Sequence, residues 1–327
     1  MCTRVLWNDN KLAVTVARTM DWPETTSPKL MVLPRGISRD GATFAGETIV
    51  AENPARWVSK YGSLVTTAFG AATVDGLNER GLAVHLLYLI DTDFGPRDTS
   101  KRGLHAGLWG QYLLDNAATV SEALELMQHI QPCMISPGET KATVHLAMED
   151  SSGDSAIVEY IGGKPVVHHG RQYCVMTNDP TYDEQLANLS KYDFTNATRE
   201  TQIPGNTSPV DRFVRASYFL PRLPEPKTER EAIAGILAIA RNVSVPFGAP
   251  NRTPDTLYDT EYRTAIDLSN LRYFFELTTA PNVLWMDLPK FDLTPGAEAR
   301  ILDPDNIDLS GNVTNKFQRV PKTPVLA

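Results

Sequence analysis

The residue with the most distinctive chemistry in this chain is Cys2, which directly follows the initiator methionine. Removal of Met1 before a small second residue is routine, and it leaves Cys2 with a free α-amine. An α-amine has a pKa of about 7.7–8.0, close to the pH at which a general base is most effective. One residue then supplies both a thiol nucleophile and its base, as an N-terminal threonine does in other hydrolases. On position alone, Cys2 is also compatible with an ordinary second residue.

The segment after Cys2 has the pattern of a β-hairpin. Two β-rich runs flank a cluster of Asn, Asp and Lys at residues 8–11, which is typical of two strands joined by a turn. If Trp7 pairs with Leu12 across this turn, Cys2 falls opposite Ala17. The hairpin therefore predicts which part of the second strand lies beside the thiol.

Two charged residues follow at the end of that second strand. Arg18 comes alongside the N-terminus in the predicted pairing, and a cation there favours the thiolate. Asp21 lies three residues further on and can hold the α-amine by a charge-assisted hydrogen bond. Taken singly, Arg18 is equally compatible with a surface charge at a strand end, and Asp21 with a turn residue. Together with Cys2, they favour a catalytic group.

Other catalytic motifs are missing from the sequence. It contains no Gly-x-Ser-x-Gly, no phosphate loop, no Gly-x-Gly-x-x-Gly and no His-Glu-x-x-His. We interpret all six histidines as structural or surface residues, because none has the spacing of a metal ligand. Cys133 and Cys174 are interpreted as free thiols without a catalytic role. We expect no metal and no cofactor. The histidines are His85, His105, His129, His145, His168 and His169.

Composition excludes several classes of protein. The 327 residues are 42% hydrophobic and 21% charged, which is ordinary for a globular protein with a sizeable core. The net charge is −8 without any basic run, so nucleic acid is not an expected partner. The longest apolar stretch, at 232–240, has about nine residues where a membrane span needs about twenty. No signal-peptide pattern opens the chain, so we expect a cytoplasmic protein, or a periplasmic one if a leader was removed ahead of Met1.

The predicted elements alternate between runs of strands and runs of helices. This order favours layered α+β architecture over a wound parallel sheet, and no break in composition divides residues 1–327, so we expect one domain with a polar, peripheral C-terminal tail from about residue 304. Ser121 is predicted to cap one helix, and Thr228 and Glu231 to form a capping box before another. Further strands are predicted at 29–33, 63–69, 82–89, 143–148, 155–161, 166–168, 173–177, 262–268, 271–277 and 283–288, and helices at 104–116, 121–130, 180–192, 210–220 and 228–240.

Five ordered motifs resemble those of the choloylglycine hydrolase family, which contains penicillin V acylases and conjugated bile salt hydrolases of bacteria. The resemblance runs from residue 2 to at least Thr278. It implies an N-terminal nucleophile hydrolase with a four-layer αββα sandwich. The motifs are Met1-Cys2-Thr3-Arg4, Ala17-Arg18-Thr19-Met20-Asp21-Trp22, Asp75-Gly76-Leu77-Asn78-Glu79-Arg80-Gly81-Leu82, Thr177-Asn178-Asp179-Pro180-Thr181 and Asp211-Arg212-Phe213-Val214-Arg215.

The resemblance implies a role for each matching position. Cys2 would be the nucleophile and its α-amine the base, with Arg18 and Asp21 beside it. Asn178 falls on the asparagine of the family's oxyanion hole, where an amide N–H stabilises the tetrahedral intermediate. Arg212 falls on the family's late active-site arginine. Without the resemblance, Asn178 is equally compatible with a turn and Arg212 with a charge on a helix surface.

The resemblance also bears on the substrate. Tyr88 stands where bile salt hydrolases usually carry Asn and some penicillin acylases carry Tyr, and its backbone N–H would complete the oxyanion hole. Trp22 resembles an aromatic residue of the acyl pocket in the Gram-negative branch. Both also fit simple packing. The expected function is thus an amidase of the penicillin V acylase type that forms a thioester intermediate and also accepts N-acyl homoserine lactones.

Three alternatives remain open at this stage. The chain could be a conjugated bile salt hydrolase. It could be a non-catalytic relative that binds an acyl ligand or serves as an assembly subunit, although the presence of all five matching polar residues argues against this. It could also be a C–N transferase that passes the acyl group to an amine. In each case the partner is a small acyl compound, and the resemblance implies a homotetramer.

Overall fold

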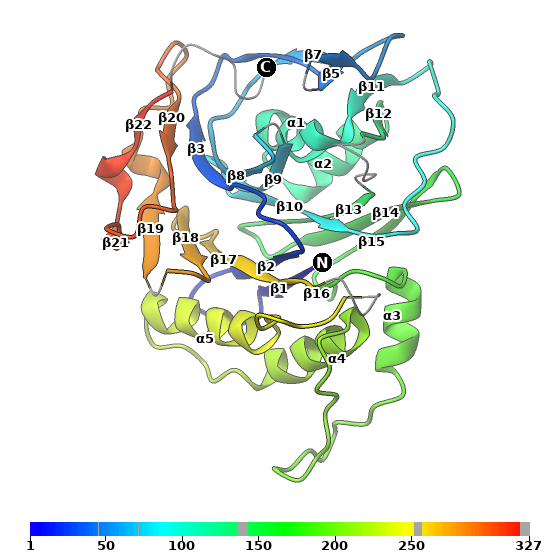
Figure 1. Ribbon diagram of the computed structural model, residues 1–327, viewed down its shortest axis with the longest axis vertical. Coiled ribbons are helices and arrows are strands. Elements are labelled where there is room, and N and C mark those ends of the chain that lie inside the picture. Colours follow the sequence, from blue (N-terminus) through cyan, green and yellow to red (C-terminus); the bar gives the residue numbers. More distant parts are fainter. Residues whose placement is uncertain (45, 71, 136–142, 252–256, 281, 321–327) are drawn as a thin grey trace.

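The chain forms two large β-sheets that pack face to face, with helices on both outer sides (Figure 1). The computed structural model describes residues 1–327 except 45, 71, 136–142, 252–256, 281 and 321–327. The layers in Figure 1 run helix, sheet, sheet, helix, and the N-terminus lies between the two sheets. This is the αββα sandwich that the resemblance implied.

The first sheet has seven strands, and the N-terminal strand is second in their order, next to an edge strand. All neighbours except β19 and β21 are antiparallel. Its order is β16 (Val175–Met176), β1 (Cys2–Trp7), β2 (Thr15–Trp22), β17 (Asp259–Asp267), β18 (Arg272–Leu277), β19 (Val283–Asp287) and β21 (Gly311–Asn312).

The second sheet has nine strands, and its central members form a meander. The predicted strands 29–33 and 155–161 are confirmed with the same bounds. The order is β15 (Lys164–His169), β14 (Ser155–Ile161), β13 (Val144–Asp150), β10 (Leu82–Tyr88), β9 (Ala72–Asn78), β8 (Ser63–Ala68), β3 (Lys29–Leu33), β20 (Arg300–Leu302) and β22 (Gln318–Arg319).

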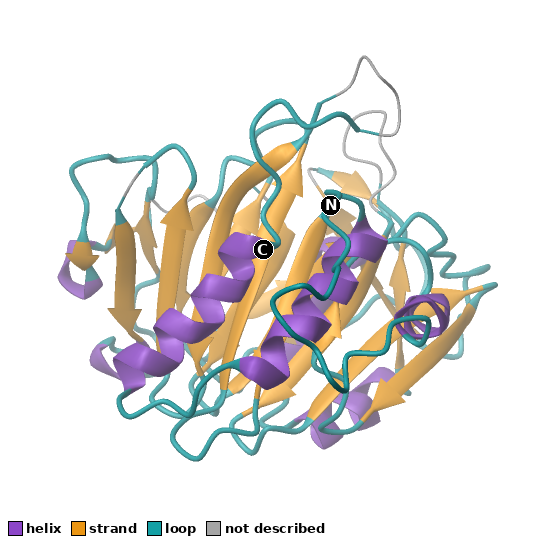
Figure 2. Cartoon of the chain, turned by 90° about the horizontal axis from the view of Figure 1, so that it is seen from below, coloured by secondary structure: helices purple, strands orange, loops and turns teal. Residues whose placement is uncertain are grey.

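Helices cover the outer face of each sheet. Helices α1 (Trp109–Asn116) and α2 (Val120–Met127) lie over the nine-stranded sheet, whereas α3 (Tyr182–Leu189), α4 (Pro209–Phe219) and α5 (Glu229–Asn242) lie across the seven-stranded sheet (Figures 1 and 2). Three short strand pairs sit outside the sandwich: β11 (Arg102–His105) with β12 (Ile130–Cys133), β4 (Ser38–Asp40) with β7 (Arg56–Val58), and β5 (Thr43–Phe44) with β6 (Glu47–Thr48). None of the described helices has the length and apolarity needed to cross a membrane.

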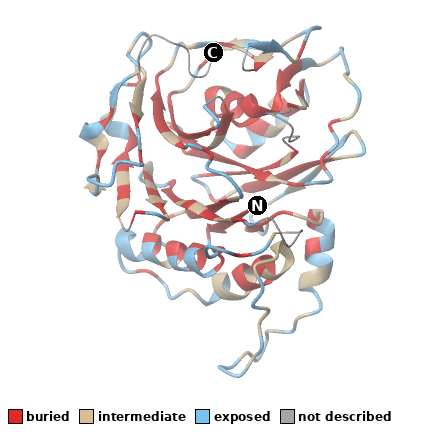
Figure 3. Ribbon diagram, viewed as in Figure 1, coloured by how far each residue is buried: buried red, intermediate tan, exposed pale blue. Residues whose placement is uncertain are grey.

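Strand alternation divides the buried residues between two cores. In β3, Leu30 and Val32 point into the space between the sheets, while Met31 and Leu33 point toward α1 and α2. Successive side chains of a strand face opposite sides, so a strand buried on both faces is a nearly continuous apolar run. Figure 3 shows this burial concentrated on the strands and on the inward faces of the helices.

Two predicted helices differ from the structure at their ends. The predicted helix 104–116 begins only at Trp109, because Leu104 and His105 belong to β11, which pairs with β12. The predicted cap of α2 is also wrong: the side chain of Thr119, not of Ser121, accepts the N–H of Glu122. Apolar spacing indicates which residues are buried, but it does not show where a short strand ends and the following helix begins.

The capping box before α5 is half formed. The Thr228 hydroxyl accepts the backbone N–H of Glu231 at 3.2 Å, as predicted, but the Glu231 carboxylate accepts the N–H of Lys227 rather than that of Thr228. The helix predicted from Pro180 starts two residues later, with Thr181 as its cap. In α2, α4 and α5 the cap side chain accepts a free N–H of the first turn and so favours the observed helix start.

The C-terminal tail takes part in the sandwich. β21 adds an edge strand to the seven-stranded sheet and β22 adds one to the nine-stranded sheet. Val313 and Phe317 are buried against the core between the sheets. The prediction that the tail is peripheral was therefore wrong, because its few apolar side chains are enough to hold it against both sheet edges.

Candidate active site

Cys2 is the first residue of β1 and is 2% exposed. It pairs with Met20 of β2, not with Ala17 as the predicted turn required. The connecting segment is longer than predicted because the Asn10 side chain accepts the N–H groups of Leu12 and Ala13 and holds them out of the strand. A shift of register by an odd number of residues exchanges the two faces of a strand. The observed register therefore places Arg18 on the same face as Cys2, where the predicted one would have turned it away.

Arg18 lies directly against the thiol. Its Nη2 is 3.3 Å from Sγ of Cys2 and 3.1 Å from the carbonyl oxygen of Leu86, and its Nη1 donates to the carbonyl of Val74. Burial acts to lower the pKa of Arg18, but attraction to Cys2 and Asp75 outweighs it and raises the pKa further above its usual value. The site therefore has a fixed cation at the sulfur.

Asp21 lies at the other side of the N-terminus. Its backbone carbonyl accepts from the α-amine of Met1, and its N–H donates to the Met1 carbonyl at 2.6 Å. Its carboxylate accepts the Thr260 hydroxyl at 2.6 Å and lies 3.3 Å from Nη1 of Arg212. Burial, followed by the nearby Arg212 and Arg18 cations, lowers the pKa of the Met1 α-amine against the opposing effect of Cys2 and Asp21.

Asn178 follows β16 and joins Cys2 to β10. Its Oδ1 accepts the backbone N–H of Cys2 at 2.5 Å, and its Nδ2 donates to the carbonyl oxygen of Tyr88 at 2.6 Å. The next N–H along the chain, that of Leu89 just after β10, donates to the carbonyl oxygen of Thr143, which directly precedes β13. Because N–H groups alternate between the two edges of a strand, the Tyr88 N–H lies on the same edge as its carbonyl, toward Asn178.

Arg212 of α4 ties these groups together. Its Nη1 donates to the carbonyl of Cys2 at 2.7 Å and to the hydroxyl of Thr3, and its Nη2 donates to Oδ1 of Asn178 at 2.9 Å. The guanidinium is fully buried and also contacts Asp21. The planar fork of an arginine suits this task, because it presents several donors in fixed directions. All five predicted polar residues are thus brought together around Cys2.

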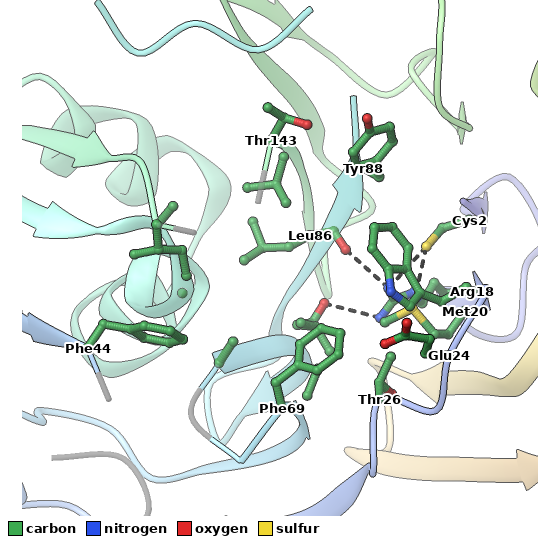
Figure 4. A pocket seen from close by; sticks show the side chains of 18 residues that line it. Cys2, Arg18, Met20, Glu24, Thr26, Phe44, Phe69, Leu86, Tyr88 and Thr143 are labelled. Atoms are coloured by element: carbon green, nitrogen blue, oxygen red, sulfur yellow. Dashed lines mark hydrogen bonds between the residues drawn. The ribbon is translucent and has the colours of Figure 1, made fainter. Parts of the chain in front are cut away.

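An apolar pocket opens from this group (Figure 4). It has a volume of about 370 Å³ and runs from Cys2 and Arg18 to buried residues near the start of α1. Glu24, at its rim, is exposed. Such a cavity is suited to an uncharged, apolar group attached to the carbonyl carbon that meets the thiol. The apolar lining consists of Met20, Trp22, Phe44, Ala68, Phe69, Ala72, Val74, Leu86, Tyr88, Ala106, Ile135 and Val144.

The two predicted pocket aromatics contact one another. The rings of Trp22 and Tyr88 meet edge to face, with their centroids 5.6 Å apart, and both line the pocket. Each is half-buried. The sequence did not indicate Phe44, Phe69 or Ile135, which come from separate loops and short strands and carry no shared spacing that could have signalled them.

No group of three or more His, Cys, Asp or Glu side chains is arranged to hold a metal ion among the residues that the structure describes. Cys133 and Cys174 are free and half-buried, and burial is the main cause that raises the pKa of each thiol.

The four-layer sandwich, with its polar residues gathered at the first residue of β1, has the architecture of the N-terminal nucleophile hydrolases. The chain belongs to the choloylglycine hydrolase family of linear amide C–N hydrolases, whose family model matches residues 2–315. It is therefore a linear amide hydrolase of the type that includes penicillin V acylases and bile salt hydrolases.

Individual relatives agree with this assignment. The chain is 38% identical to a penicillin V acylase of Pectobacterium atrosepticum over 92% of its own length and 85% of the relative's. A solved penicillin V acylase from Agrobacterium tumefaciens is 39% identical, with a TM-score of 0.87 over 98% of both chains. A conjugated bile acid hydrolase structure from Clostridium perfringens is 20% identical, with a TM-score of 0.78 over 95% of this chain and 98% of that one, and shows the shared fold.

Proposed function

We propose that this protein is an N-terminal cysteine amidase of the penicillin V acylase type. The observation that carries the proposal is the position of the Cys2 thiol, which lies against Arg18 at one end of an apolar pocket. A nucleophile at one end of such a pocket suits an amide whose acyl part is apolar and whose amine part points away from the pocket.

The reaction begins once Met1 is removed, because Cys2 N then becomes the α-amine. That nitrogen lies 2.5 Å from Oδ1 of Asn178, which orients it beside the sulfur. The thiolate attacks the substrate carbonyl, a C–S bond forms, and the carbonyl oxygen becomes an oxyanion. Asn178 Nδ2 has a second hydrogen beyond the one given to Tyr88, and this hydrogen together with the Tyr88 N–H stabilises the oxyanion.

The tetrahedral intermediate then collapses. The α-amine of Cys2, which took the thiol proton when the thiolate formed, now gives that proton to the leaving nitrogen. The C–N bond breaks, and the acyl group remains on sulfur as a thioester. Water attacks the thioester with the α-amine as general base, which releases the carboxylic acid and restores the thiol. Arg18 supports the sulfur when it is anionic, and Arg212 keeps Cys2 and Asn178 in register.

Penicillin V and long-chain N-acyl homoserine lactones are the first substrates to test. The penicillin V acylases named above are 38–39% identical to this chain, and the aromatic wall formed by Trp22 and Tyr88 suits either a phenoxy group or an alkyl chain. Conjugated bile salts are the second class, since a bile salt hydrolase/transferase of Bifidobacterium longum is 23% identical over 90% of this chain.

The test is the release of free amine from penicillin V, an N-acyl homoserine lactone and glycocholate, measured side by side with Cys2→Ala as control. Intact mass establishes that Met1 has been removed. Cleavage of either of the first two substrates, lost in Cys2→Ala, supports the proposal. Cleavage of glycocholate alone contradicts the substrate assignment but retains the mechanism. An active Cys2→Ala variant refutes the mechanism.

We also propose that the chain is one domain that assembles into a homotetramer, as the family resemblance implies. The measurement is light scattering coupled to size exclusion, and a mass equal to that of the single 36.1 kDa chain would refute it.

A further inference from the structure

A continuous chain of buried ionic groups runs between the two sheets and ends at the Cys2 thiol. Its members are Arg4 of β1, Glu149 of β13, His85 of β10, Asp75 of β9 and Arg18 of β2, and every one of these side chains is fully buried. Buried charges are costly unless they are paired. An arrangement of five in alternating sign therefore needs an explanation beyond packing.

The contacts along the chain are short. Arg4 Nε donates to Oε2 of Glu149 at 3.0 Å, and Oε1 of the same carboxylate lies 2.6 Å from Nε2 of His85. Nδ1 of His85 lies 3.2 Å from Oδ1 of Asp75, and Oδ2 of Asp75 lies 3.7 Å from Nη1 of Arg18. Arg18 Nη2 then reaches Sγ of Cys2 at 3.3 Å.

His85 is the centre of this chain, and the two carboxylates beside it favour its protonated form. Its Nε2 is hydrogen-bonded to Glu149, and its Nδ1 lies within ionic contact of Asp75 at 3.2 Å without hydrogen-bond geometry. A neutral imidazole has only one N–H to offer to two such carboxylates. Burial alone would lower the pKa of His85, but Glu149 and Asp75 outweigh it and raise the pKa to about 9. In return, His85 helps to lower the pKa of both carboxylates against the effect of their burial.

Other polar groups face the chain from every packed element. The Thr264 hydroxyl of β17 donates to Oδ2 of Asp75 at 2.6 Å, and Ser155 of β14 accepts from Arg4 at 3.0 Å. Tyr262 of β17 stacks on Arg18, with its ring centre 5.8 Å from the guanidinium carbon, and Tyr273 of β18 lies near Asp75. Burial raises the pKa of both phenols well above the usual value, so they remain neutral.

The charges of the chain have a simple balance. With His85 protonated, three cations and two carboxylates leave one positive charge, which a thiolate at Cys2 would neutralise. Without the charge on His85, Asp75 would have Arg18 as its remaining ionic partner, and a thiolate would leave the buried group with excess negative charge. The protonation state of His85 therefore affects whether the Arg18 guanidinium is free to pair with a thiolate at Cys2.

We propose that His85 is a positioning residue of the active site, whose positive charge holds Asp75 and so leaves the Arg18 guanidinium free to support the Cys2 thiolate. This inference rests on the proposed function, because it assigns the thiolate of Cys2 as the reacting species. It does not require His85 to touch the substrate.

The test is the alkylation of Cys2 by iodoacetamide as a function of pH, followed by the mass of the N-terminal peptide. This readout needs no substrate, and Cys133 and Cys174 are counted separately in their own peptides. In His85→Gln we expect the midpoint of the Cys2 profile to rise by about one pH unit, and the rate at neutral pH to fall about tenfold. Loss of packing alone would change the melting temperature but not this midpoint.

Two carboxyl-to-amide variants provide matched controls. Glu149→Gln removes an anion from the chain and leaves His85 in place, so the midpoint should stay at the wild-type value or fall. Asp115→Asn removes a buried carboxylate paired with Arg39, away from the pocket, so it should lower stability without moving the midpoint. Should His85→Gln fail to fold, Glu149→Gln decides the matter: an unchanged or lower midpoint supports the proposal, and a higher midpoint refutes it.

A His85→Gln midpoint within 0.2 pH units of wild type, or about the same increase in Glu149→Gln, would overturn the proposal. Amide hydrolysis by the wild-type protein is measured independently. If hydrolysis is absent while the alkylation shifts appear, the proposed function fails and the ionic chain still acts on Cys2.

Discussion

The buried end of the pocket provides a direct test of how the protein selects its acyl group. Gly107 lies there, between Ala106 and the first turn of α1. A Cβ at this position would be 3.2 Å from Nδ1 of His105, 3.3 Å from Cβ of Ala72 and 3.3 Å from Cδ1 of Ile135. These distances are tighter than ordinary contacts, so a methyl group cannot enter without pushing its neighbours or taking volume from the pocket.

The expected magnitude follows from the volume lost. Alanine has no side-chain rotamers, so Ala72 cannot turn its Cβ away from the added methyl group. Gly107→Ala should therefore take space from the substrate and displace roughly one or two methylene groups of the acyl chain. Burial of one methylene is worth about 0.8 kcal/mol, which corresponds to a factor of about four in kcat/KM. We therefore expect about a 4- to 15-fold loss for the longest accepted acyl chain and little change for the shortest.

The assay compares kcat/KM over a series of N-acyl homoserine lactones that differ only in acyl length. Gly205→Ala is the matched control, because it makes the same chemical change in a loop where no atom lies within 4 Å of the added Cβ. The wild-type protein and Gly205→Ala should share one chain-length profile, and Gly107→Ala should have a shorter optimum.

An unchanged profile in Gly107→Ala would refute the reasoning, because it would mean that the acyl chain does not reach this end of the pocket. A uniform loss for all chain lengths would also count against it, since that outcome indicates a distorted site rather than a shortened pocket.

Three further predictions concern the polar groups. Arg212→Lys should lower the unfolding free energy by about 3–5 kcal/mol in urea titrations, because an ammonium cannot hold Cys2 and Asn178 together; a loss below about 1 kcal/mol would contradict this. Tyr88→Phe should keep kcat/KM within about threefold, since the backbone of Tyr88 makes the contact to Asn178. The pKa of His85 is raised above its ordinary 6.5 to about 9, so its stabilisation, about 3 kcal/mol, is complete below pH 6.5 and is lost as pH rises through 9. The stability difference between wild type and His85→Gln should shrink over that range, and a constant difference would show that its charge is not involved.

Sequence reasoning predicted the strands more closely than the helix ends. β3 and β14 have the predicted bounds, and the run at 82–89 is β10 to within one residue. These strands are apolar on both faces because both faces are buried, and this composition is visible in the sequence itself. The start of α1 was wrong because β11 and α1 share one apolar run, and only the pairing of β11 with β12 separates them.

The nucleophile could be identified from its residue type and its place in the sequence. The other site residues reach it only through strand pairing and helix packing. Cys2 stands out because it follows Met1. Arg18 and Asp21 were placed from a hairpin whose predicted register was three residues off. Asn178 and Arg212 were indicated by motif resemblance alone, and α4 carries Arg212 to Cys2 across 210 positions of the chain.

What the sequence by itself determined is the local chemistry: a thiol at the chain start, an alternation that makes buried strands, and turn residues between them. The tertiary structure decided which face of β2 meets Cys2, how strands and loops from distant parts of the chain enclose the pocket, and how His85 comes to lie between two carboxylates. Residues distant in the chain share no periodicity. Their contacts arise only when two sheets pack face to face and the space between them excludes water, which makes each buried charge depend on its neighbours.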